Sequence, residues 1–175
     1  MWSLEWMTSG LAALIVLGLS ALITIGVIAA WLLWRPYRAV RQEKSLARAR
    51  REFHLRREQL EAKFLRQAGE SGKPRGLRWV DCDFENDVTY ARDKRSGELS
   101  AFVGVTIGFE AIEGGGMEEV EAVGNLRAAT AVFSFDENRQ WYTEGRAIFN
   151  LNPAEAIQYY QANLELVAQE AAGSR

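Results

Sequence analysis

The side chains that most often carry out chemistry are scarce in this 175-residue sequence, which has one cysteine, Cys82, and one histidine, His54. A single cysteine excludes an intramolecular disulfide, and a structural zinc site needs about four Cys or His ligands. His54 lies in a run of arginines, where the neighbouring cations disfavour its protonation and no carboxylate is evident to orient the ring as in a serine triad. The sequence therefore predicts no metal site, no cofactor and no enzymatic activity.

Carboxylates are the remaining candidates for chemistry. A pair for acid–base catalysis could come from Asp81, Asp83, Glu110 and Glu144, although nothing in the sequence shows that two of them converge. A second acidic group could hold a hard cation and consists of Glu110, Glu113, Glu118, Glu119 and Glu121. This group lacks the alternating Asp/Asn ligands of a calcium loop, and the glycines beside it lack the Gly-Lys-Ser/Thr ending of a phosphate loop. A solvated loop is the favoured interpretation.

The amino-terminal part of the chain contains a long uncharged segment, Leu11–Trp34. A helix of this length spans roughly 36 Å, enough to cross a hydrocarbon core of about 30 Å. Aromatic residues flank both ends: Trp2, Trp6, Trp31, Trp34 and Tyr37. The sequence lacks the basic start and short apolar region of a cleaved signal peptide. We therefore expect a transmembrane helix over 11–34, retained as a signal-anchor, after a short extracytoplasmic tail over 1–10.

The flanking charges predict an orientation for this segment. The basic residues that follow it are Arg35, Arg38, Arg41, Lys44, Arg48, Arg50 and Arg51. Because positive charge near a membrane helix stays cytoplasmic, we expect the N-terminus outside and the C-terminal domain in the cytoplasm. Small residues at Ser20, Thr24, Gly26 and Ala30 have a spacing that allows close helix approach, but such residues are common in apolar helices.

Residues 35–68 predict a second, basic helix. An apolar stripe runs along it through Leu46, Phe53, Leu60 and Phe64, with seven-residue spacing over its first three members. The helix could lie on anionic lipid headgroups, pair with itself or another helix in a coiled-coil-like manner, or form a solvated stalk. Residues 35–75 carry a net charge of +8 and residues 76–175 a net charge of −9. The acidic part would repel phosphate, so nucleic acid is not an expected partner.

After a linker over 69–76, the pattern changes to the alternation of β-strands and predicts a soluble α+β domain over 77–171. About five strands joined by short turns favour an antiparallel meander. Two short strands are expected within 80–93, and a long strand over 99–111 would pack one face on a core and leave the other thinly covered. Asn152, Pro153 and Glu155 form a capping-box signature, and a helix is predicted from there to about residue 171. Its apolar face would contain Ile157, Tyr160, Leu164 and Val167 and would pack on the sheet. Residues 172–175 would form a tail.

Aromatic residues of this domain could line a pocket between sheet and helix or could simply form its core. They are Trp79, Tyr90, Phe102, Phe133, Phe135, Trp141, Tyr142 and Phe149. Phe102, Phe133 and Phe135 could instead lie on an uncovered face and form a partner surface. The leading functional hypothesis is a non-enzymatic, single-pass protein held in a lipid bilayer, whose α+β domain docks a protein partner or its own copies. The alternatives are a membrane-tethered domain that binds a small ligand or lipid, and an enzyme that uses a carboxylate pair.

Overall fold

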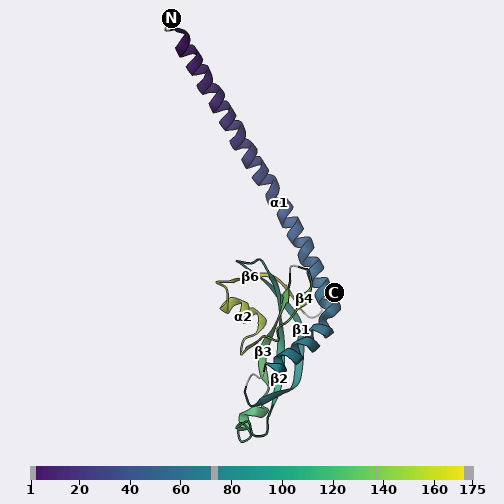
Figure 1. Cartoon of the computed structure of the whole chain (residues 1–175). Helices are drawn as coiled ribbons and strands as arrows, with labels where there is room; N and C mark the ends of the chain where they lie inside the picture. The colour runs from purple at the N-terminus through teal and green to yellow at the C-terminus, as the bar shows by residue number, and fades with distance from the viewer. Residues whose placement is uncertain (1–2, 72–74, 137, 172–175) are drawn as a thin grey trace. The chain divides into compact units, whose positions relative to one another are not determined.

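The computed structural model describes residues 3–71, 75–136 and 138–171, and for residues 3–16, 32–42 and 122 it describes the backbone only. The predicted tail over 172–175, the first two residues and part of the predicted linker lie outside these ranges. In chain order the elements are helix α1 (Ser3–Glu70), strands β1 (Leu77–Asp93) and β2 (Leu99–Ala111), 3-10 helix η1 (Glu121–Gly124), strands β3 (Arg127–Phe135), β4 (Trp141–Tyr142) and β5 (Ala147–Phe149), helix α2 (Pro153–Tyr159) and strand β6 (Leu164–Glu170) (Figure 1).

The prediction of a transmembrane helix over 11–34 is contradicted. Within the described residues, no helix is both long enough and apolar enough to span a membrane. The apolar segment belongs to a single 68-residue helix that continues through Pro36 into the basic region, and its described side chains cover residues 17–31. The predictions of a signal-anchor, of a single-pass membrane topology and of a cytoplasmic C-terminal domain depended on this span and are corrected with it.

The chain divides into two compact units, Met1–Arg48 and Ala49–Arg175. The described part of the first unit is helical throughout. The second unit contains the last turns of α1, all six strands and α2, and it forms an α+β domain as the sequence predicts.

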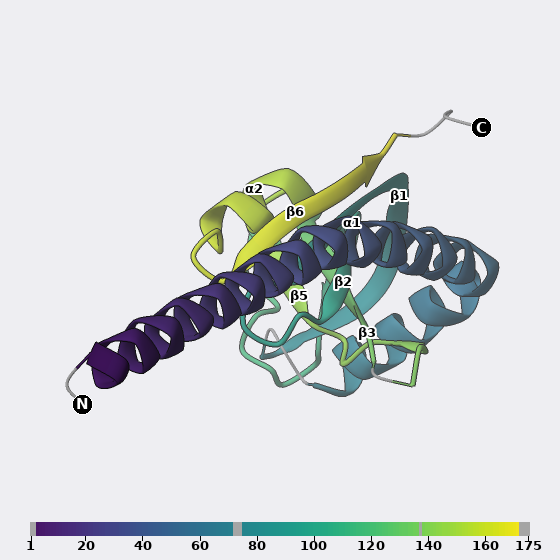
Figure 2. The same ribbon diagram turned by 90° about the horizontal axis from the view of Figure 1, so that it is seen from above.

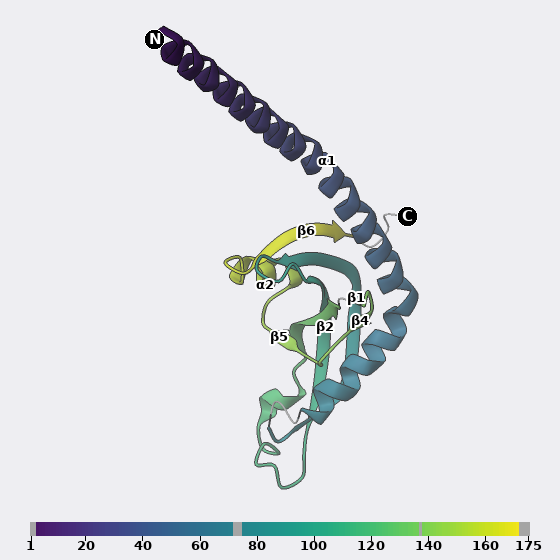
Figure 3. The ribbon, with the colours of Figure 1, turned by 45° about the horizontal axis from the view of Figure 1, so that its top comes forward.

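The sheet is antiparallel and has the strand order β4-β3-β2-β1-β6, with β5 also paired to β3. The two strands predicted within 80–93 are one long strand, β1, whose pairing with β2 shifts between Trp79 and Asp81 and again between Phe84 and Val88. Such shifts mark bulges that bend a strand. Figure 3 shows β1 and β2 as long curved neighbours.

Two helices cover opposite faces of the sheet. Phe53 of α1 packs against Tyr90 and Phe133, with ring centroids 6.1 and 5.5 Å apart. The next residue of β1, Ala91, packs with Ile157 of α2. Successive side chains of a strand point to opposite faces, so α1 and α2 lie on opposite sides. Both faces of β2 are therefore largely buried, whereas the alternation had predicted one thinly covered face.

The C-terminal helix is shorter than predicted, because Leu164–Glu170 form strand β6. The predicted capping box is confirmed: Asn152 Oδ1 accepts from the Glu155 amide at 2.9 Å, and the Asn152 amide donates to the Glu155 carboxylate at 3.0 Å. The helix ends at Tyr159, and β6 then pairs with β1, which lies beside it in Figure 2. Pairing with an available strand outweighs the weak helical periodicity of this segment.

Candidate functional site

The apolar stripe proposed for helix pairing lies mostly inside the α+β domain. Phe53 and Phe64 are fully buried and Leu60 nearly so, whereas Leu46 is half-buried. The Phe64 ring lies 5.8 Å from Phe84 in the sheet. These side chains therefore pack against the strands of their own chain.

The predicted basic surface divides into three groups. Only the backbone is described for Arg35, Arg38 and Arg41. Three cationic side chains, Lys44, Arg48 and Arg51, are exposed. Arg50 is instead partly buried and contacts Glu170 at the end of β6.

Glu170 is the centre of a polar cluster that links α1 to two strands. Its carboxylate accepts hydrogen bonds from Arg50 Nε and from Tyr90 Oη, the latter at 3.3 Å, and lies 2.7 Å from His54 Nε2. Burial by itself would raise the pKa of Glu170, but the hydrogen bonds from His54 and Arg50 and their positive charge outweigh burial and lower it. Burial and the nearby Glu170 raise the pKa of Tyr90. The expectation that His54 lacks an orienting carboxylate is wrong, because its partner is 116 residues away along the chain.

The structure gives the candidate carboxylates separate positions. Asp81, Asp83 and Glu144 are exposed, and Glu110 is exposed in an ion pair with Arg78 at 2.7 Å. Among the described residues, no group of three or more His, Cys, Asp or Glu side chains could hold a metal ion. In the acidic loop, backbone amides lower the pKa of Glu118, and its carboxylate accepts from the Gly114 amide. These contacts stabilise the loop itself.

Four of the eight aromatic residues proposed as a pocket lining or partner surface are buried core residues. Tyr90 and Phe133 are fully buried, and Phe102 and Trp141 are at least 95% buried. Phe102 packs beneath α2. The Trp141 indole donates to the Ala49 carbonyl at 2.8 Å. The predicted surface around Phe102 and Phe133 is therefore absent in this domain.

Among the side chains that the structure describes, a long run of exposed apolar residues lies in the first unit. Seven large aliphatic side chains between Leu17 and Ile28 are each more than half exposed. The two polar side chains in this stretch bond within the helix: Ser20 Oγ donates to the Leu17 carbonyl at 2.9 Å, and Thr24 Oγ1 to the Ala21 carbonyl at 2.8 Å. This segment can thus be buried without leaving either hydroxyl unpaired.

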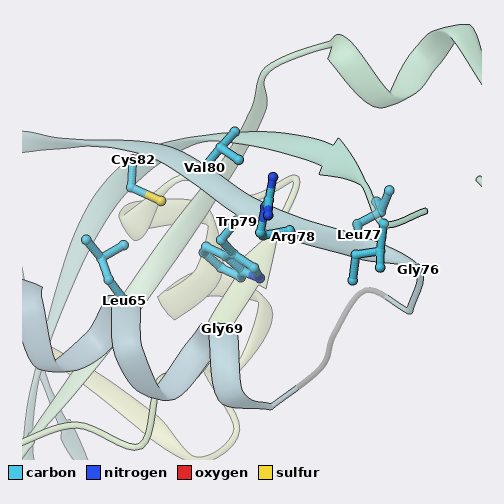
Figure 4. A pocket seen from close by; sticks show the side chains of 9 residues that line it. Leu65, Gly69, Gly76, Leu77, Arg78, Trp79, Val80 and Cys82 are labelled. Carbon is cyan, nitrogen blue, oxygen red and sulfur yellow. The ribbon is translucent and has the colours of Figure 1, made fainter. Parts of the chain in front are cut away.

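A pocket of about 270 Å³ opens between the end of α1 and the start of β1 (Figure 4). Its lining consists of Leu65, Gly69, Gly76, Leu77, Arg78, Trp79, Val80, Cys82 and Ile112. Burial, and next the charge of Asp81, raise the pKa of the Cys82 thiol to about 11. Because that thiol is largely protonated at neutral pH, Cys82 forms part of an apolar wall and reacts only slowly as a nucleophile.

One edge of β1 borders this pocket. Strand β6 pairs with β1 only over Val88–Asp93, so no strand of the described residues pairs with the same edge over Leu77–Phe84. The next stretch is covered, because Arg57 donates to the carbonyls of Glu85 and Asn86. Sequence analysis missed this edge because it divided β1 into two strands.

In comparisons with protein-family models, with curated proteins and with solved structures, no significant match to this chain was found.

Proposed function

We propose that this chain is a non-enzymatic assembly module, in which the apolar helix over residues 17–31 packs against the same segment of other copies. The observation that carries the proposal is the exposure of seven large aliphatic side chains in succession along this helix. Exposed apolar patches of this kind mark interaction sites. The α+β domain has its own core, built from α1 residues beyond Ala49 and from the sheet.

The composition of this helix favours more than two copies. The exposed aliphatic side chains point in different directions around the helix axis, as the positions of Leu17, Leu19, Leu22 and Ile23 show. The apolar surface therefore surrounds the axis and does not form a single stripe. One partner helix would leave part of this surface in water. Burying three of these side chains contributes about 5 kcal/mol before the cost of association. Several neighbouring helices bury more of the apolar surface around each helix than a single partner does.

The proposal is tested by the native mass of the full chain in aqueous buffer at micromolar concentration. We expect a homogeneous oligomer, and we expect Ile23→Glu to shift it towards the monomer because each copy would then bury a carboxylate. Leu55→Glu is the matched control, since Leu55 is 76% exposed on the part of α1 that belongs to the α+β domain. A monomeric wild type, or equal effects of the two variants, would contradict the proposal.

A small-ligand site is the second candidate function, and the pocket beside Cys82 favours it. Its mainly apolar lining suits a small apolar molecule. Native mass spectrometry of the purified chain would detect a retained molecule. Wild-type chain without added mass, in a preparation never exposed to denaturant, would count against this candidate.

A further inference from the structure

We propose that the open edge of β1, Leu77–Phe84, binds an extended segment of another protein as an added β-strand, and that this segment alternates apolar and basic residues. This inference goes beyond the assembly proposed above and does not depend on it. An exposed strand edge supplies main-chain groups for such pairing, and neighbouring pockets for alternate side chains supply specificity.

The lining of the pocket shows that its space runs along the strand edge. Leu77, Trp79 and Cys82 pair with positions of β2 on the face covered by α1, whereas Arg78 pairs with Glu110 on the opposite face. Side chains of both faces line one pocket only if the pocket follows the edge between them. Figure 4 shows Trp79 and Cys82 pointing towards α1, with Leu65 of that helix beside them.

A docked strand would therefore place alternate side chains against this apolar wall. The neutral thiol of Cys82, the Trp79 ring and Leu65 favour an aliphatic side chain there. Val80 is 47% exposed and lies where the pairing of β1 with β2 shifts, so it borders the entrance. A bulge at a sheet edge commonly redirects a side chain in this way.

The negative charge along this strand edge favours a partner segment with basic side chains. Asp81 and Asp83 are exposed and do not line the pocket, and the only cation between Leu77 and Phe84, Arg78, is already paired with Glu110. A basic side chain on the outward face of a docked strand would lie opposite these carboxylates. A second copy of β1 would instead bring four aspartates together, which disfavours it.

The test uses the full chain and a fluorescent six-residue peptide that alternates valine and lysine. A peptide of the same composition in block order, three valines followed by three lysines, controls for non-specific charge attraction. Binding is measured by fluorescence anisotropy, and occupancy of the pocket by protection of Cys82 from N-ethylmaleimide. We expect the alternating peptide to bind about tenfold more tightly than the block peptide and to slow alkylation of Cys82.

Charge variants test the selection. We expect Asp81→Lys together with Asp83→Lys to weaken binding about tenfold. The matched control is Glu113→Lys with Glu119→Lys, which makes the same charge change at exposed sites in the acidic loop. Equal binding of the two peptides, unprotected Cys82, or equal effects of the two variant pairs would each overturn the proposal. A dimer of the Ile23→Glu variant that the alternating peptide dissociates would also overturn it, because a second copy would then occupy this edge. Ile23→Glu should leave peptide binding unchanged, so failure of the helix assembly remains distinguishable.

Discussion

The stability of the α+β domain depends on pH through the ionisation of Glu170. Because its pKa is lower in the folded state than the ordinary value of 4.5, it stabilises the fold above that pH, and the contribution is lost as the pH falls through the folded-state pKa. We expect Glu170→Gln to lower the free energy of unfolding by about 1 kcal/mol at pH 7. The loss is small because solvent screens the interaction at the half-exposed His54.

Urea denaturation at pH 7 and at pH 3 measures the difference in the free energy of unfolding between the wild type and Glu170→Gln. It should be smaller at pH 3, because this pH lies below the ordinary carboxyl pKa of 4.5 and part of the stabilisation by the charged carboxylate is already lost there. Glu165→Gln is the control, because Glu165 is exposed on the same strand. A loss for Glu170→Gln that is equal at both pH values would show that the charge of Glu170 is not responsible.

Gly145 permits the closest approach between the β4–β5 connection and α1. Its φ of +70° disfavours a side chain, and an added Cβ would lie 2.7 Å from the Gln67 carbonyl carbon and against the Ala68 amide. We expect Gly145→Ala to destabilise the domain by about 3 kcal/mol. At Gly97, φ is +76° but the space around it is open, so Gly97→Ala should cost only about 1 kcal/mol. Thermal unfolding compares the stability of Gly145→Ala with that of Gly97→Ala. Similar losses of stability would contradict the close packing of Gly145 against α1.

At the scale of elements, α2 depends on its first turn because it has only seven residues. We expect Asn152→Ala to lower the free energy of unfolding by about 1 kcal/mol, since the Glu155 amide would lose its acceptor. Asn138 is exposed outside the helices, and Asn138→Ala should change stability by less than ~0.5 kcal/mol. Denaturant titration measures both. Indistinguishable values would show that the cap does not stabilise the folded domain.

The same elements show how far sequence reasoning extends. The cap of α2 and the buried face of β2 depend on residues close in sequence, and the sequence predicted both. The stripe through Phe53 and Phe64 predicted an apolar helix face but could not identify its partner, because heptad spacing is compatible with a helix or with a sheet. Strand β6 was missed for a related reason: its conformation depends on pairing with β1, more than 70 residues earlier.

The candidate sites were harder to predict than the fold. The cluster at Glu170 joins α1 to the last strand, and no local pattern indicates such a long-range pair. The edge of β1 is defined by where β6 stops pairing, which is a property of the sheet and not of β1 itself. The membrane prediction failed differently: it depended on the apolar length of residues 11–34 and on the aromatic residues that flank them, whereas no helix of the described residues is long and apolar enough to span a membrane.

At the scale of the whole molecule, the two compact units predict where the chain can be shortened. The unit Ala49–Arg175 includes the turns of α1 that carry Phe53 and Phe64, both fully buried against the sheet. We therefore expect a chain beginning at Ala49 to unfold cooperatively. A chain beginning at Ser71 would lose the helix and the cover of one sheet face, and each deleted aromatic ring alone is worth about 3–5 kcal/mol.

Circular dichroism and urea denaturation show whether each of the two shortened chains is folded. Native mass gives the oligomeric state of each. We expect the chain from Ala49 to be folded and monomeric, because it keeps the core but lacks the exposed apolar helix over 17–31. The chain from Ser71 should show no cooperative transition. A folded chain from Ser71 would mean that α1 is dispensable to the core. An oligomeric chain from Ala49 would place the assembly surface in the α+β domain and not in the apolar helix.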